Sequence, residues 1–348
     1  MRLYIILMLC LFAFCTLKII KKSELLTINN FDTKNTLPLR GILAILIVLH
    51  HTLFFTKNAN LFIHYAYTQF IIWGALIVGV FFFITGYGLT FSIINKGKSY
   101  LSGFFYKRII KILIPAIIAT LLFQAGEIYS GQFSFSKIIS NLSQGILPLP
   151  NSWYVVAIVY FYIAFWFCFK HLSIKHAIIL MWFLSLLYIF IIKYFLKFEH
   201  YWWISTFALN IGMTVAYKEP KIKEFICKKP KVGLFATFLF FLIPTTYALT
   251  NSQTELDLPL GDIPIYWTTP AVLAIIIYYM GVAKNKILDF FGKISYEIYL
   301  THGIFMMWYS KFSQNWLLYI ILTYISTIII AYLLHKLCNQ INKKLIKK

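Results

Sequence analysis

Long apolar runs recur along the whole chain, and short polar segments that hold most of the lysines and arginines separate them. Each run has about 17–25 residues, the length that an α-helix needs to cross ~30 Å of hydrocarbon. The chain lacks the segments of about ten residues with alternating apolar and polar positions that are typical of a membrane β-barrel. The pattern therefore predicts an all-α, polytopic transmembrane helix bundle of about 10 or 11 spans. The predicted spans cover residues 3–20, 40–56, 69–92, 109–126, 152–169, 174–196, 201–217, 232–249, 265–283, 294–310 and 314–335.

The composition agrees with this pattern. Hydrophobic residues make up 60% of the 348 residues, charged residues make up 12%, and the mean hydropathy is +0.77. A soluble domain of this size has about half apolar and about a quarter charged residues. The composition therefore argues against a soluble globular protein.

The net charge of +21 would suit a nucleic-acid partner or anionic lipid, but its distribution indicates membrane topology instead. Segments on one side of the predicted spans contain 26 Lys and Arg residues, and segments on the other side contain six. Basic segments stay in the cytoplasm. We expect a multi-pass protein of the plasma membrane with a cytoplasmic C-terminus, contacts to membrane lipid and no nucleic-acid partner.

The first apolar run, residues 3–20, follows Arg2 and begins like a signal peptide. No small-residue cleavage site follows it, and three lysines come directly after the run. We predict a retained anchor span and cytoplasmic linker over residues 1–36, before a transmembrane domain over residues 37–348. The five cysteines lie in predicted spans or on the cytoplasmic side, so we expect neither a disulfide framework nor a metal site.

The stretch LRGILAILIVLHH, Leu39 to His51, places ionisable residues at both ends of an apolar run. A helix advances ~100° and ~1.5 Å per residue, so Arg40 and His51 share one face and lie ~16 Å apart along the axis. His50 is displaced from that face by ~80°. Ionisable side chains at membrane depth are costly and usually face a cavity or the bundle interior. A structural histidine that donates to a neighbouring helix is the alternative, but the aligned Arg40 favours a functional pair.

Five segments together resemble the acyltransferase-3 family of integral membrane acyltransferases, in the family's order and over about residues 37–335. The first is LRGILAILIVLHH, in which an arginine precedes a histidine by eleven positions. The other four are FFFITGYGLT (Phe81–Thr90), FFYKRIIKILIPAII (Phe104–Ile118), SWYVVAIVYFYIAF (Ser152–Phe165) and FGKISYEIYLTH (Phe291–His302).

The resemblance implies transfer of an acyl group, commonly acetyl, from acyl-CoA to a hydroxyl, most often on a cell-surface or exported glycan. Acyl-CoA (acetyl-CoA) would be a co-substrate and not a permanently bound cofactor. A glycan or lipid-linked glycan acceptor would be the second partner. The extra first span departs from the family's ten-helix pattern.

Histidine suits the activation of a hydroxyl because it titrates near neutrality. We predict His51 as the general base or as a transient acyl carrier. His302 is the second catalytic candidate, nine residues beyond Lys293 and therefore at similar depth. Glu297, a rare carboxylate in the same span, is a third candidate, although pairing with a nearby lysine would explain it equally well.

The phosphates of CoA require cations at the cytoplasmic rim, and we predict Arg40, Lys107, Arg108 and Lys111 for this role. The alternative is that these are ordinary topology-setting residues. The family's basic cluster usually reads Arg-x-x-Arg, and Lys111 replaces the second arginine. Lysine keeps the charge but loses the bidentate fork.

Aromatic residues on the outer side are candidates for sugar binding. The segment TNSQTELDLPLGDIP, Thr250 to Pro264, is acidic and lies beside Tyr266 and Trp267. Trp153 and Tyr154 begin another span and are predicted for the same role. A plain solvated loop with an aromatic belt is the alternative.

A polysaccharide or lipid-linked glycan exporter, or a flippase without catalysis, is the rival interpretation. It would explain many spans and buried polar groups. Transporter sites often lie on helices with Gly or Pro interruptions in corresponding halves of the chain, and the sequence shows no such pair. Turnover of acyl-CoA by the purified protein without a membrane gradient separates the two interpretations.

Overall fold

A computed structural model describes residues 31, 34–70, 73–229, 231–233, 235, 239, 263–280, 285–312 and 314–346. All regular structure in this part of the chain is helical, with no strand, which confirms the all-α prediction. Six helical stretches within these residues are long and apolar enough to cross a membrane. They are Leu37–Thr56, Leu61–Leu101 (which passes over residues 71 and 72, outside the described residues), Phe105–Tyr129, Trp153–His171, Ile174–Phe195 and Trp316–Lys344. The predicted span 3–20 and most of 232–249 lie outside the described residues.

The chain divides into two compact units. The first takes residues 1–39, 75–100 and 167–287, and the second takes residues 40–74, 101–166 and 288–348. Each unit is therefore assembled from segments that are far apart in the sequence.

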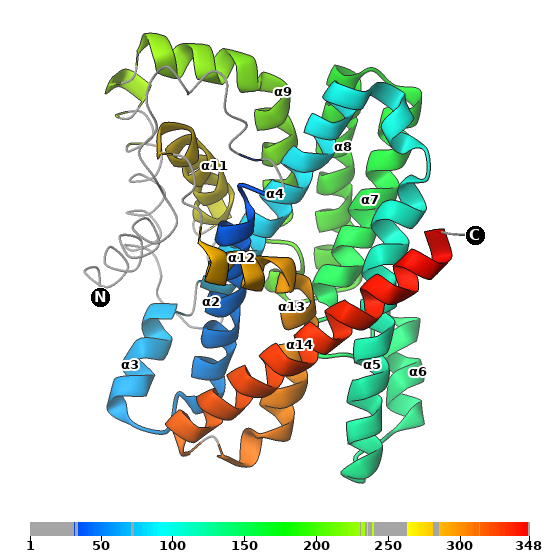
Figure 1. Cartoon of the computed structure of the whole chain (residues 1–348), viewed down its shortest axis with the longest axis vertical. Coiled ribbons are helices and arrows are strands. Elements are labelled where there is room, and N and C mark those ends of the chain that lie inside the picture. The colour runs from blue at the N-terminus through cyan, green and yellow to red at the C-terminus, as the bar shows by residue number, and fades with distance from the viewer. Residues whose placement is uncertain are drawn as a thin grey trace. The chain divides into compact units, whose positions relative to one another are not determined.

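The second unit contains most of the helices that matter for the candidate site. They are α2 (Leu37–Thr56), α3 (Leu61–Phe70), the π-helix η2 (Phe105–Ile110), α5 (Lys111–Tyr129), α6 (Phe135–Ser143), the start of α7 (Trp153–His171), α12 (Lys286–Lys293), α13 (Ser295–Trp308) and α14 (Trp316–Ile346). Helices α5, α13 and α14 pack against one another (Figure 1). Ala119, Leu300, Ile304 and Leu334 form the buried centre of this contact.

Close helix approach in the second unit depends on glycines. A side chain at Gly126 of α5 would overlap the indole of Trp308 in α13. A side chain at Gly41 of α2 would overlap the backbone of Leu288 in α12. Burial of apolar side chains at such contacts stabilises the packing at about 25 cal/mol per Å² removed from solvent, so these positions fix how the helices meet.

The first unit is built on α4 (Trp73–Lys96), α8 (Ile174–Phe190), α9 (Phe207–Lys228) and α11 (Ile263–Met280). Helix α9 packs against α8 and α11. Helices α4 and α9 also approach closely. A side chain at Gly86 of α4 would overlap the backbone of Leu209, and a side chain at Gly212 of α9 would overlap the backbone of Phe83.

The course of α9 differs from the prediction. The predicted span 201–217 ended before a basic cytoplasmic loop, whereas the helix continues to Lys228. Its buried face includes Met213, Glu219, Lys223 and Ile226, which recur at helical spacing. Glu219 and Lys223 are therefore buried helix residues and not solvated loop residues.

Three short helices and one extension were also not predicted. Helices α3 and α6 lie mainly in predicted outer loops, and α12 lies in a predicted cytoplasmic loop. All three are too short to cross a bilayer, so a search for long apolar runs misses them. Helix α14 continues past the predicted end at residue 335 to Ile346. The prediction ends early because the last turns of the helix are polar, and a search for apolar runs does not include them.

Candidate active site

Three histidines lie together in the second unit. The ring centroid of His51 in α2 is 5.1 Å from that of His302 in α13 and 4.8 Å from that of His50. His50 Nδ1 is 2.8 Å from the backbone oxygen of Phe70. The His50 ring also occupies the space where a side chain at Gly74 would lie. His50 therefore packs closely and makes a hydrogen bond to a backbone carbonyl. This is the structural role that an intramembrane histidine can have in place of a catalytic one.

His302 and His51 differ in what surrounds their ring nitrogens. The His302 side chain is fully buried. Its Nδ1 is 3.2 Å from the backbone oxygen of Ile298, and its Nε2 is 3.2 Å from Nδ2 of Asn151. His51 is partly exposed, and among the described residues neither of its ring nitrogens has a hydrogen-bond partner. Of the three histidines, His51 is thus the one with neither ring nitrogen engaged in a hydrogen bond within the described residues.

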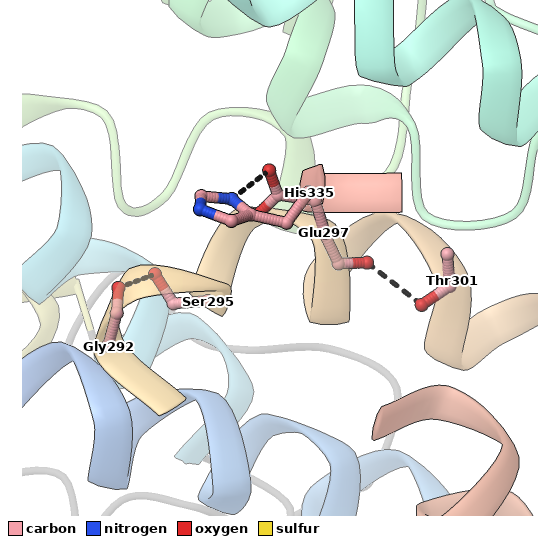
Figure 2. A network of polar contacts seen from close by, with 5 residues as sticks. All are labelled: Gly292, Ser295, Glu297, Thr301 and His335. Carbon is pink, nitrogen blue, oxygen red and sulfur yellow. Dashed lines mark hydrogen bonds and ion pairs between the residues drawn. The ribbon is translucent and has the colours of Figure 1, made fainter. Parts of the chain in front are cut away.

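Glu297 lies in a different cluster. Its Oε1 is 2.9 Å from Nδ1 of His335 in α14. Figure 2 shows this contact as a dashed line. Glu297 precedes His302 by five residues, which places the two side chains ~140° apart around α13. Nearby, Ser295 Oγ donates to the Gly292 oxygen and Thr301 Oγ1 donates to the Glu297 backbone oxygen. The structure therefore pairs Glu297 with an imidazole of α14 and not with His51.

The sequence predicts no role in the site for His335. It is the last residue of the predicted span 314–335, where a polar side chain is expected at a membrane boundary. Only the packing of α14 against α13 brings it to Glu297.

The structure brings together two of the four predicted rim cations. The electrostatic neighbours of Arg40 include Arg108 of η2 and the phenols of Tyr154 and Tyr162 in α7. Arg108 lies in a π-helix, a widened turn that often occurs at functional sites. The same widened turn changes which direction successive side chains take, so the spacing from Arg108 to Lys111 is not that of one regular α-helical turn.

Lys107 and Lys111 are placed differently. Lys107 is exposed, and its Nζ donates to the backbone oxygen of Ser102 at 3.2 Å. Lys111 is exposed at the first position of α5. Both remain predicted phosphate contacts, but the structure gives them solvent-facing positions, unlike Arg40 and Arg108.

The predicted sugar-binding aromatics divide between the two units. Trp153 is buried at the start of α7, and the ring of Tyr154 lies 5.3 Å from that of Tyr299 in α13. These residues belong to the same unit as His51.

Tyr266 and Trp267 belong to the first unit, where packing accounts for both. Tyr266 is buried. Trp267 donates its indole N–H to the Ile204 oxygen at 2.8 Å, and its ring lies 4.4 Å from that of Phe207. The acidic segment 250–262 lies outside the described residues.

The model of the acyltransferase domain family Acyl_transf_3 matches residues 39–336. The chain belongs to the acyltransferase-3 family, and it is a membrane acyltransferase. No curated protein and no solved structure matches the chain.

Proposed function

We propose that this protein transfers an acyl group, acetyl in the simplest case, from cytoplasmic acyl-CoA to a hydroxyl of a cell-surface or exported glycan. The observation that carries the proposal is the arrangement on α2. His51 is partly exposed, free of hydrogen bonds among the described residues and in ring contact with His302. Arg40 on the same helix has Arg108 as an electrostatic neighbour.

The two arginines support an acyl-CoA donor. Like charges that lie close together repel each other, and an anion between Arg40 and Arg108 would relieve that repulsion. Guanidinium groups bind phosphate through two parallel hydrogen bonds, and CoA carries several phosphates. Lys107 and Lys111, both exposed, would extend this binding to the outer phosphates.

The predicted orientation of the protein in the membrane also supports acyl-CoA as the donor. The side of the predicted spans that holds 26 of the 32 basic residues faces the cytoplasm under the positive-inside rule. Arg40 begins its apolar run on that side, where acyl-CoA is available. The protein would then be a multi-pass plasma-membrane enzyme with a cytoplasmic C-terminus.

In the proposed reaction His51 accepts the proton of the acceptor hydroxyl as its oxygen attacks the thioester carbonyl carbon. The new C–O bond forms, the C–S bond breaks, and the proton passes from His51 to the departing CoA sulfur. In the covalent variant a ring nitrogen of His51 attacks the thioester carbon, the C–S bond breaks, and the ring N–H proton passes to the departing CoA sulfur. The acyl-imidazole then transfers its acyl group to the hydroxyl oxygen, and the hydroxyl proton restores the imidazole N–H. A radiolabelled acyl group trapped on the wild-type protein without acceptor, and absent from His51→Ala, would select the covalent route.

Mass analysis of surface glycans from cells with and without the gene tests the proposal. Loss of an acyl ester from the glycan on deletion, with the glycan itself retained, is the expected result. The purified protein should also turn over acyl-CoA in detergent, without a membrane gradient. Loss of the surface glycan with its acylation unchanged would instead support the exporter, and would overturn the transfer reaction proposed here.

A further inference from the structure

The turn before α7 holds an asparagine in an unusual backbone conformation. Asn151 has φ 59°, in the left-handed region, which non-glycine residues rarely adopt. Asparagine tolerates this region better than most residues, and such conformations persist only where the surroundings enforce them. The conformation therefore requires contacts that hold the turn in place.

Hydrogen bonds from both neighbouring helices supply those contacts. Tyr299 of α13 donates its hydroxyl to the Asn151 backbone oxygen at 2.6 Å. Gln124 of α5 donates to the Pro148 oxygen at 2.8 Å, and Ser152 Oγ donates to the Leu147 oxygen at 3.0 Å. The turn is thus fixed to α13 and α5 from two sides.

A glycine allows the turn to reach α13. A Cβ atom on Gly303 would lie 2.8 Å from Cβ of Pro150 and 3.1 Å from Nδ2 of Asn151. Both distances are shorter than carbon and nitrogen atoms tolerate without movement. Gly303 follows His302 directly, so the absence of its side chain lets the Asn151 amide approach that imidazole.

The hydrogen-bond partners of His302 specify which of its ring nitrogens carries the proton. The Ile298 carbonyl can only accept, so the hydrogen lies on His302 Nδ1, 3.2 Å away. His302 Nε2 then presents a lone pair, which accepts from the Asn151 amide at 3.2 Å. Both nitrogens of this buried ring are occupied, and the ring is neutral in this arrangement.

We propose that Asn151 is a positioning residue of the acyl-transfer site, which acts by holding His302 as the neutral Nδ1–H tautomer against His51. The inference rests on the proposed function. Protonation of His302 at Nε2 would replace an accepting lone pair with an N–H that faces the amide donor. A neutral His302 presents no positive charge 5.1 Å from the His51 ring, and such a charge would oppose proton uptake by His51.

Asn151→Gly tests the amide separately from the backbone. Glycine adopts positive φ without strain, so this variant keeps the turn and removes only the amide. We expect only a small drop in the unfolding temperature in detergent, because the buried His302 Nε2 loses its donor, and an acetyl-CoA KM within about twofold of wild type. The kcat should fall about 10- to 100-fold through loss of positioning. Full wild-type kcat in Asn151→Gly would overturn the inference and show that Asn151 serves only the turn.

Asn151→Asp provides a second variant if the glycine variant does not fold. Aspartate has nearly the same shape and also tolerates positive φ, but its carboxylate has no N–H to donate to His302 Nε2. It should lose kcat as well, and unchanged kcat would contradict the inference.

A double-mutant cycle shows whether Asn151 acts through His302. In a His302→Leu background, Asn151→Gly should cause no further loss of kcat, because the imidazole that it positions is gone. A full additional loss there would assign the effect to the turn itself and overturn the inference. If wild-type protein turns over no acyl-CoA, the proposed function fails and this inference fails with it. If wild type and Asn151→Gly are equally active, only the inference fails.

Discussion

Two groups of polar side chains lie within the helical packing, one in each unit. They differ in whether every member has an ion-pair or hydrogen-bond partner within its group. In the first unit, Lys223 Nζ lies 3.0 Å from Glu219 Oε1, and Tyr87 donates its hydroxyl to Glu219 Oε2 at 2.6 Å. In the second unit, His302 has partners at both nitrogens, whereas His51 beside it has none among the described residues.

The difference indicates what each group does. Glu219 and Lys223 neutralise each other one helical turn apart, and Tyr87 of α4 joins them to a second helix. Such a link between two helices holds them in register. His51 makes no hydrogen bond within the described residues, and a titratable ring left unengaged beside a second imidazole is typical of a site that awaits a substrate.

The largest expected effect is on catalysis at His51. General-base assistance contributes about 10²–10⁴-fold, so His51→Ala should lose about that much acyl-CoA turnover. The unfolding temperature should change little, because the removed ring is partly exposed and makes no hydrogen bond within the described residues. Turnover and thermal unfolding measured on the same preparation check both. Loss of folding together with activity would show that His51, like Glu219, serves stability. That result would contradict the catalytic role assigned to His51.

The next effect is on stability at the buried ion pair. Glu219→Ala leaves Lys223 buried without its counter-charge, and removal of one partner from a buried pair typically costs about 3–5 kcal/mol. A lowered unfolding midpoint in detergent measures this loss. Residual folded protein should keep its acetyl-CoA KM.

Helix α9 supplies a matched control for this variant. Glu224 and Lys228 form a second pair with the same spacing, 2.6 Å apart, but both side chains are exposed. Solvent screens such pairs, so Glu224→Ala should leave the midpoint nearly unchanged. Equal destabilisation by the two variants would show that burial does not distinguish the pairs.

A smaller effect is expected at the donor site. Arg108→Ala should raise the KM for acyl-CoA by about tenfold through loss of one charge-assisted phosphate contact. Lys229→Ala is the control, since Lys229 is an exposed cation of the same predicted cytoplasmic side. Arg40→Lys should also lose affinity if the planar fork is used. Identical effects of the Arg108 and Lys229 variants would attribute donor binding to general positive charge.

The smallest effect is a labelling difference that leaves activity intact. In a background without the native cysteines, Lys137→Cys in α6 should react with an impermeant reagent added to intact cells. Lys221→Cys in α9 should react only after lysis. Both positions are exposed in the structure. Labelling of both from outside would refute the predicted orientation and the cytoplasmic donor.

Much of the fold follows from local sequence. The apolar lengths of residues 40–56, 109–126 and 174–196 predict helices that the structure contains to within a few residues at most ends. Helix α9 exceeds its predicted end because Glu219 and Lys223 read as polar loop residues, whereas their mutual pairing allows them to be buried. A one-dimensional hydropathy pattern does not contain that pairing.

The site was predictable only where its geometry is local. Arg40 and His51 share a face of one helix, and that relation follows from the helical repeat. The contact between Asn151 and His302 joins residues 151 positions apart. It depends on a left-handed turn and on the absence of a side chain at Gly303. In the sequence, Asn151 is a polar residue after a proline and indicates only a turn.

The most direct test compares acyl-CoA turnover of His51→Asn and His50→Asn. The two rings are adjacent on α2, and asparagine places an N–H near the former Nδ1, so His50→Asn can still donate to the Phe70 oxygen. We predict that His51→Asn loses about 10²–10⁴-fold in kcat and that His50→Asn stays close to wild type. An inactive His50→Asn with an active His51→Asn would contradict the assignment of acyl transfer to His51.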